Sequence, residues 1–266
     1  MSFAAHQPRR RFGQHWLVDQ SVLERIVAAA ELTPDDHVLE VGPGRGALTA
    51  RLLASPAAAV TAVELDRDLT GGLLQRFGGD RRFRLLEGDV LAVPLPPATK
   101  VVANIPYNIT GPLLERLVGR LDRPVAAPYR RLVLLVQREV GERICGLPGS
   151  GAYSALSVRL QLLGRCRGLF TVAPSCFRPP PKVQSQVICI DPLPAAERLD
   201  PALARSVEQL LRRCFASRRK MLRNSLAPLA LARSVGVELA QRPQELPPAA
   251  WVSLAAVLNQ AAGHHR

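Results

Sequence analysis

The stretch Lys100-Val-Val-Ala-Asn-Ile-Pro-Tyr-Asn-Ile-Thr110 joins an apolar run to a polar loop. The run at residues 101–103 is typical of a short buried strand in a parallel sheet. Pro106 has no backbone N–H to donate to a neighbouring strand, so we expect the strand to end at Asn104. Ligands of open α/β sheets bind in such loops. An amide, backbone carbonyls and the Tyr107 ring suit a flat heterocycle that carries an exocyclic amine.

A glycine-rich turn, Gly42-Pro-Gly-Arg-Gly46, lies between a predicted strand at residues 38–41 and a predicted helix at residues 47–53. Glycine adopts positive φ and lets the backbone approach a ligand closely. The next predicted strand ends at Glu64, at the position where an acid can accept hydrogen bonds from a ribose diol. The turn and the acid together favour a nucleoside cofactor over a structural turn with a solvated acid. The GxGxG spacing differs from the GxGxxG of dinucleotide sites.

Strands and helices alternate through the first two thirds of the chain, which predicts a doubly wound α/β sheet. Asp89 ends the third predicted strand, where its carboxylate either binds an adenine amino group or belongs to an ordinary turn. Two late strands are expected to pair at the sheet edge. The expected strands are 58–63, 82–89, 131–136, 170–172 and 187–190, and the expected helices are 111–121, 137–144 and 153–163.

The N-terminal segment leads into a predicted helix at residues 22–30, with Ser21 as N-cap and Glu24 completing a capping box. Before this helix come an aromatic ring, an amide and an imidazole, which could lie over a ligand. The alternative is a packed arm in which Trp16 and Leu17 cover an edge of the core.

A proline-rich loop, Ser175-Cys-Phe-Arg-Pro-Pro-Pro-Lys-Val183, lies between the two late strands. Three consecutive prolines predict an extended, stiff segment. Phe177 would then be an exposed aromatic ring at the start of the loop. A surface loop with Phe177 turned into the protein is the alternative.

The pattern becomes purely helical after residues 191–194, which predicts a catalytic domain at 1–194 and a small α-helical domain at 195–266. The expected helices are 201–215, 219–231 and 251–262. Arginines are dense in this region. If one helix ran from Arg212 to Arg223, both would share a face with Arg219, but Ser217 could equally cap a new helix and break that stripe. The charge density favours a phosphate-contacting surface over a merely solvated face.

Composition points to a polyanionic partner, because 35 Lys and Arg residues against 22 Asp and Glu residues give a net charge of +13. No signal peptide or membrane span is expected. The five cysteines include no CxxC pair, so we expect a reduced, cytoplasmic protein without a zinc site. Nothing in the sequence suggests more than a monomer.

These motifs together resemble the ribosomal RNA adenine dimethyltransferase family, in particular its small-subunit enzymes, over almost the full length. The stretch Asn104–Tyr107 is the most specific of them. The others are Phe12-Gly-Gln-His-Trp-Leu17, Glu40–Gly46, Val63–Asp66, Gly88-Asp89, Gln137–Val140, Leu156–Val158, Phe177–Val183 and Arg218–Leu226.

The resemblance implies a Rossmann-like fold and S-adenosylmethionine (SAM) as cofactor. It implies dimethylation of the N6 amines of two adjacent adenines in the 3′-terminal hairpin of small-subunit rRNA, within a 30S-type particle and with a role in subunit biogenesis. The implied catalytic residues are Asn104, Pro106, Tyr107 and Phe177. The implied cofactor residues are His15, Leu17, Gly42, Glu64, Asp89 and Asn104, the RNA-binding residues are Arg212, Arg219, Lys220 and Arg223, and no metal is implied.

The sequence departs from the family pattern at three positions. His15 stands where Asn is usual, Trp16 where Phe is usual, and Gln184 where Asp is usual. Three rival functions are weighed against the resemblance. A large-subunit adenine methylase is disfavoured by the proline loop and the basic C-terminal segment, and a non-enzymatic assembly factor by the intact Asn104 loop. An NAD-dependent dehydrogenase is disfavoured by the glycine spacing and by the lack of a hydride-site histidine.

Overall fold

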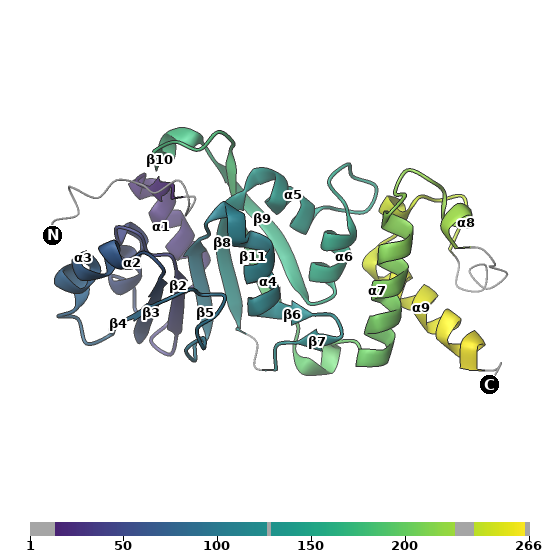
Figure 1. Ribbon diagram of the computed structural model, residues 1–266, viewed down its shortest axis with the longest axis horizontal. Coiled ribbons are helices and arrows are strands. Elements are labelled where there is room, and N and C mark those ends of the chain that lie inside the picture. Colours follow the sequence, from purple (N-terminus) through teal and green to yellow (C-terminus); the bar gives the residue numbers. More distant parts are fainter. Residues whose placement is uncertain (1–13, 127–128, 227–236, 264–266) are drawn as a thin grey trace. The chain divides into compact units, whose positions relative to one another are not determined.

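The computed structural model describes residues 14–126, 129–226 and 237–263 and contains a mixed sheet (Figure 1). Within these residues the sheet has seven strands in the order β4-β3-β2-β5-β8-β11-β9. Their bounds are β2 His37–Val41, β3 Ala59–Glu64, β4 Phe83–Glu87, β5 Lys100–Asn104, β8 Arg131–Gln137, β9 Gly164–Val172 and β11 Ser185–Pro192. The predicted Rossmann-like α/β fold is therefore confirmed, and both late strands lie at one edge.

The order of the strands reverses between β2 and β5, which are parallel neighbours. From β2 the chain proceeds outward through β3 and β4, and it then returns to β5 and continues to β8, with all these pairs parallel. β11 then pairs antiparallel with β8. At such a reversal the two loops after neighbouring strands diverge and leave a crevice for a ligand. Here those loops are the glycine turn and the Asn104 loop.

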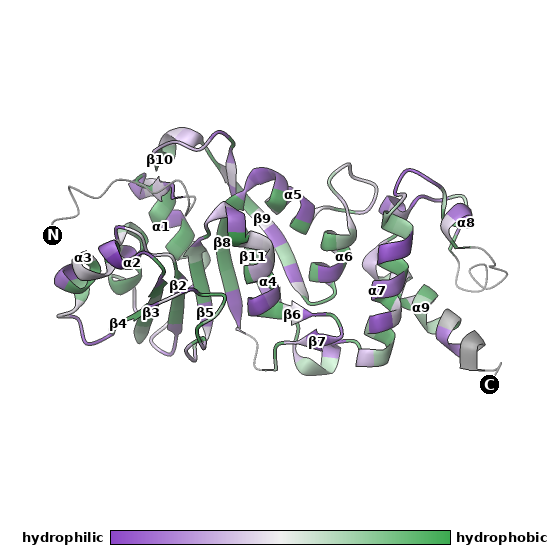
Figure 2. Ribbon diagram, in the orientation of Figure 1, coloured by the Kyte–Doolittle hydropathy of each residue, from purple (hydrophilic) through white to green (hydrophobic). Residues whose placement is uncertain are grey.

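Both faces of the central strands are buried, which is why their sequences are apolar runs instead of alternating patterns (Figure 2). One face, with Val38, Val60, Val102 and Val133, packs against the helices α1, α2 and α3 in a single hydrophobic cluster. The helices of this region are α1 Gln20–Ala29, α2 Ala47–Leu53, α3 Arg67–Phe77, α4 Thr110–Val118 and α5 Arg138–Cys145.

The predicted N-cap of α1 is wrong. The helix begins at Gln20, and Asp19 caps it by accepting a hydrogen bond from the Val22 N–H. Ser21 lies inside the helix and its hydroxyl donates to the Asp19 carboxylate. Both residue types cap helices well, and the carboxylate stands at the position where the free N–H groups converge.

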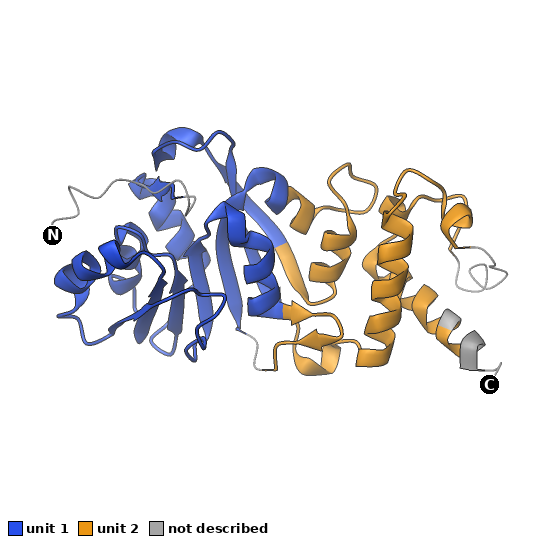
Figure 3. Ribbon diagram, in the orientation of Figure 1, with its two compact units in different colours: residues 1–118, 127–141, 167–192 blue, residues 119–126, 142–166, 193–266 orange. Residues whose placement is uncertain are grey.

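By internal contacts the chain divides into two compact units (Figure 3). Unit 1 is residues 1–118, 127–141 and 167–192, and unit 2 is residues 119–126, 142–166 and 193–266. Unit 2 thus takes in residues 119–126, 142–166 and 193–194, which were predicted to belong to the catalytic domain. Its helices are α6 Ala155–Gln161, α7 Pro201–Phe215, α8 Leu222–Ser225 and α9 Pro248–Gly263, and its short strands are β6 Gly119–Arg120 and β7 Arg123–Pro124.

The prediction of a helix at residues 219–231 is wrong for the part of this range that the structure describes. α7 ends at Phe215, residues 216–220 form turns, and α8 covers only Leu222–Ser225; residues 227–231 lie outside the described part. The proposed stripe of arginines on one continuous helix is therefore broken near Ser217. Arg212, Arg219, Lys220 and Arg223 are nevertheless all exposed.

Candidate active site

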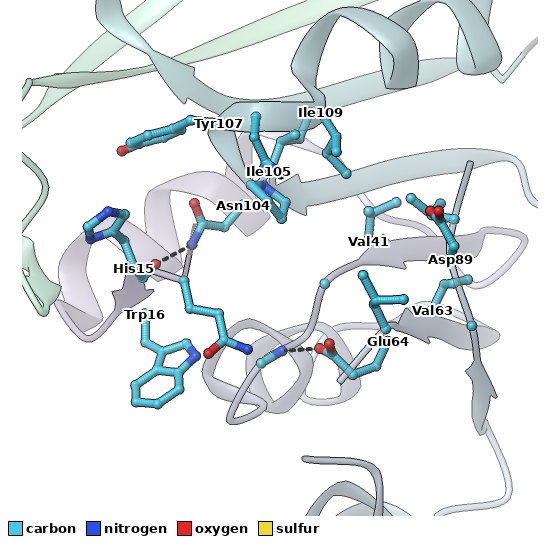
Figure 4. A pocket seen from close by; sticks show the side chains of 18 residues that line it. His15, Trp16, Val41, Val63, Glu64, Asp89, Asn104, Ile105, Tyr107 and Ile109 are labelled. Atoms are coloured by element: carbon cyan, nitrogen blue, oxygen red, sulfur yellow. Dashed lines mark hydrogen bonds between the residues drawn. The ribbon is translucent and has the colours of Figure 1, made fainter. Parts of the chain in front are cut away.

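A cavity of about 350 Å³ opens where β2, β3, β4 and β5 end, and it lies wholly within unit 1. Figure 4 shows Glu64 and Asp89 on one side of it, and Asn104, Tyr107 and His15 on the other. The size falls in the range of small-molecule sites. Of the predicted site residues, the cavity brings together His15, Gly42, Glu64, Asp89, Asn104, Pro106 and Tyr107.

The glycine turn forms the floor of the cavity. Gly42 and Gly44 have φ of +65° and +58°, in the left-handed region that side chains other than glycine's rarely adopt. A Cβ on Gly44 would lie 2.9 Å from Trp16 Cδ1. Residues 14–17, the N-terminal arm, therefore pack directly on a turn that has no side chain at Gly44. The Trp16 ring also stacks with the Arg45 guanidinium at 4.0 Å. The glycines therefore serve both a strained turn and close packing.

Glu64 is held by the backbone of the turn. Its carboxylate accepts hydrogen bonds from Gly44 N at 3.0 Å and from Asp66 N at 2.8 Å. Burial raises the pKa of Glu64 above its usual value, although these two hydrogen bonds oppose the shift. The side chain is thus fixed as an acceptor at the end of β3. Asp89, at the end of β4, is exposed, and one of its oxygens accepts from Leu91 N at 2.8 Å.

Asn104 is oriented by the N-terminal arm. Its Nδ2 donates to the backbone carbonyl of His15 at 3.1 Å, which directs Oδ1 the other way, towards Tyr107 (Figure 4). The following residues turn at once into a short 3₁₀ helix, η3 Tyr107–Ile109, in which the Pro106 carbonyl accepts from Ile109 N. The amide therefore presents an acceptor to the cavity from the end of a buried strand.

Tyr107 is held at its hydroxyl and at one face. The hydroxyl lies 2.6 Å from Ser185 Oγ, and burial raises the pKa of the phenol above its usual value. The His15 ring stacks on Tyr107 with centroids 5.8 Å apart. His15 Nδ1 in turn donates to the Pro179 carbonyl at 2.9 Å, so the arm joins the Asn104 loop to the proline loop.

Two of the predicted catalytic and cofactor residues lie outside this cavity. Phe177 is fully buried in the core, so of the two alternatives for the proline loop the structure shows the one in which Phe177 turns into the protein. It lies in β10, Phe177–Arg178, which pairs with β1, Trp16–Leu17. Leu17 is likewise buried and lines a smaller cavity of about 160 Å³, beside Gly42 and Glu40. The alternation of the short strands turns both side chains inward.

Several functional contacts are not evident from the sequence. Gln14 donates to the Asp66 carboxylate at 2.9 Å and ties the arm to the end of β3. Ser185 and Gln184 are 78 and 46 residues away from their partners Tyr107 and Arg138. No spacing rule reveals contacts of that kind. Gln14 and Asp66 both lie within motifs that the sequence does single out, and this is the only available signal for their contact.

Glu40 is a buried carboxyl at the base of the turn. It accepts from the Thr49 hydroxyl at 2.7 Å, while its other oxygen has no hydrogen-bond partner. Burial, with a smaller contribution from Glu64, raises the pKa of Glu40 to about 8. In the folded protein the side chain is therefore mainly protonated at neutral pH.

The described residues contain no group of three His, Cys, Asp or Glu that could hold a metal ion. No described helix is long and apolar enough to cross a bilayer. A parallel sheet with a glycine turn after its first core strand, an acid after the second and an asparagine loop at the switch point defines a Rossmann-like methyltransferase.

The family model for "Ribosomal RNA adenine dimethylase" matches residues 5–260, and the chain belongs to this family of methyl-transferring enzymes. It is 66% identical over 272 residues to "Ribosomal RNA small subunit methyltransferase A" of Parasynechococcus marenigrum, covering 98% of this chain and 90% of the relative. The relative of the same name from Synechococcus sp. strain RCC307 is 63% identical, covering 98% of this chain and 100% of the relative.

Two solved structures share the fold over nearly the whole chain. A dimethyladenosine transferase from Plasmodium falciparum has a TM-score of 0.80 at 25% identity, covering 93% of this chain and 98% of the other. The 23S rRNA methyltransferase ErmE has a TM-score of 0.77 at 28% identity, covering 92% and 100%. The fold alone therefore does not separate small-subunit from large-subunit substrates.

The pKa of Glu40 leads to a test of stability against pH. A carboxyl whose folded-state pKa lies above its usual 4.5 stabilises the fold most at low pH, and that stability is lost as the pH rises towards 8. We expect Glu40→Gln to remove this loss, so its advantage over the wild type should grow from pH 5 to pH 8. The slope should approach ~1.4 kcal/mol per pH unit, for one proton. Urea unfolding at each pH measures it.

Glu24→Gln is the matched control, because Glu24 is exposed on α1. Its unfolding free energy should follow the wild type at every pH. A constant difference between Glu40→Gln and the wild type across the range would show that Glu40 is charged in the folded protein.

Proposed function

We propose that the chain binds SAM and dimethylates the N6 amines of two adjacent adenines in the 3′-terminal hairpin of small-subunit rRNA. The observation that carries the proposal is that Asn104 Oδ1 and the Tyr107 ring lie beside each other at a nucleoside-sized cavity. The 66% identity to a small-subunit methyltransferase supports the choice of substrate.

The cavity fits the cofactor in its hydrogen-bond acceptors and in the space that Gly42 leaves. Glu64, fixed by two backbone N–H groups, has remaining lone pairs for a ribose diol, and Asp89 is exposed at the end of β4 for an adenine amine. At Gly42, an added Cβ would contact Pro106 at 3.7 Å and would narrow the passage between the two loops. The bare glycine thus leaves room for the methionine end. His15 lines the same cavity from the arm, whereas Leu17 lies beside Gly42 in the smaller cavity.

When bound, SAM supplies an electrophilic methyl group. The target is a neutral amine whose lone pair is delocalised into the adenine ring, so a strong base is not needed at the start. Asn104 Oδ1 and the carbonyl of Ile105 or Pro106 would accept hydrogen bonds from the two N–H groups of this amine. Those bonds tilt the lone pair out of the ring plane and stabilise the positive charge that develops on nitrogen. The extra proton leaves after the nitrogen has become tetrahedral.

Tyr107 supplies the platform on which the extruded base stacks. Its ring lies beside Asn104, in the turn that follows β5. Two neighbouring side chains therefore orient the base and its amine. Orientation of this kind supplies much of the rate when a methyl group moves in line between two atoms. Phe177 would supply a second face only if β1 and β10 moved together, since both pack into the core.

Contacts with the ribosomal particle belong to the basic residues of unit 2. Arg212, Arg219, Lys220 and Arg223 are exposed, and the net charge of +13 favours a polyanionic partner. We propose that this region, with the rest of residues 195–266, contacts rRNA within a 30S-type particle. The enzyme would act as a cytoplasmic monomer on that particle.

The reaction itself is tested by incubating the protein with methyl-labelled SAM and undermethylated small subunits. Nucleoside analysis should then show N6,N6-dimethyladenosine, and naked rRNA should be a poor substrate. Methylation of naked large-subunit rRNA would instead assign the chain to the other substrate class. No transfer to any RNA would favour a non-enzymatic binding role.

Asn104→Ala tests the acceptor. We expect turnover to fall by ~100-fold or more, the size typical for the loss of a group that stabilises transition-state charge. SAM affinity, measured by calorimetry, should change by less than ~3-fold, because the amide acts on the target amine and contributes little to binding of the cofactor. Asn104→Asp keeps an acceptor oxygen but loses the donor to the His15 carbonyl, so it separates orientation from acceptance. An equal loss of affinity and turnover in Asn104→Ala would place Asn104 in the cofactor site.

The double change Arg219→Glu and Arg223→Glu tests the RNA surface. Binding to small-subunit rRNA should weaken by ~10-fold or more, and the slope of log K against log salt should become shallower by about one per lost phosphate contact. Arg81→Glu with Arg84→Glu changes the net charge equally, on exposed positions of unit 1. Equal slopes in both variants would move the RNA surface elsewhere.

A further inference from the structure

Ser185 is a buried serine that the sequence gives no reason to notice. It is the first residue of β11, its side chain is fully buried, and its hydroxyl lies 2.6 Å from the Tyr107 hydroxyl. At this distance two hydroxyl groups are hydrogen bonded. Ser185 is not among the residues that line the cavity, so it acts on Tyr107 without facing a ligand.

The backbone around Ser185 is fixed on both sides. In the antiparallel ladder Ser185 pairs with Gln137, the last residue of β8. The preceding residue, Gln184, accepts a hydrogen bond from Arg138 N through its backbone and another from Arg138 Nη1 through its side chain, at 2.9 and 2.6 Å. Ser185 Oγ is therefore a stationary anchor.

The anchor matters because Tyr107 follows the strand in a short 3₁₀ turn. His15 stacks on one face of the Tyr107 ring, with centroids 5.8 Å apart. The hydroxyl end of Tyr107 is held by Ser185. A buried phenol hydroxyl without a partner would turn towards another acceptor. The plane of the ring, and with it any base stacked on the ring, would then turn as well.

We propose that Ser185 is a positioning residue for methyl transfer, which holds the Tyr107 ring in the plane on which the target adenine stacks. The inference rests on the proposed function, since it assigns Tyr107 the acceptor base. It makes Ser185 important for turnover and unimportant for cofactor binding, because the hydroxyl pair lies on the acceptor side of the cavity.

A double-mutant cycle tests this coupling. Ser185→Ala, Tyr107→Phe and the double variant are compared with the wild type by kcat on undermethylated small subunits and by SAM Kd from calorimetry. Each single change should lower kcat by ~10-fold while Kd changes by less than ~2-fold, and the double variant should also lose ~10-fold, not ~100-fold. If Ser185→Ala does not fold, Ser185→Cys, which keeps a weak acceptor, takes its place in the cycle.

Ser157→Ala is the matched control, because Ser157 is also fully buried and its hydroxyl bonds the Arg143 carbonyl. It should lower the melting temperature without lowering kcat. Wild-type kcat in Ser185→Ala or in Tyr107→Phe, or losses that multiply in the double variant, would overturn the inference. A wild-type protein that methylates no RNA would instead overturn the proposed function, and this inference with it.

Discussion

The parallel pairing of β2 with β5 is the constraint on which the site depends. The pairing sets Val41 beside Ala103, so the glycine turn and the Asn104 loop leave the sheet at the same level and diverge. Each loop alone is a common feature. Side by side, they place the glycine turn, where the cofactor would bind, next to Asn104, which would accept hydrogen bonds from the target amine. Glu64 and Asp89 face the same cavity from the ends of β3 and β4.

The N-terminal arm contacts both of these loops. Gln14 bonds Asp66, the His15 backbone orients Asn104, and Trp16 packs on Gly44. Because a single short segment contacts the walls of the cavity on both sides, the arm cannot leave one wall and keep the others. The His15 ring stands where the family usually has Asn, and it lies on Tyr107. This change from the family pattern is therefore on the side of the cavity where the target base would bind.

Sequence reasoning succeeded where one local pattern determines the structure. Apolar runs gave β2, β5 and β8, and glycine spacing gave the turn, because burial and φ are properties of a few neighbouring residues. It failed where two local solutions compete, as for Asp19 and Ser21 at the start of α1. It failed again where tertiary contacts decide. Phe177 is buried by its pairing with Leu17, and Ser185 matters through a residue 78 positions away.

The burial of Phe177 also bears on how the site could change on binding RNA. Phe177 and Leu17 face each other across β1 and β10, and both pack in the same core cluster. Moving Phe177 towards the cavity would therefore expose Leu17 and disturb the arm that orients Asn104. Exposing two large apolar side chains costs about 3–6 kcal/mol. A second aromatic face at Phe177 thus requires contacts from the substrate that offset this cost, whereas Tyr107 already lies at the cavity.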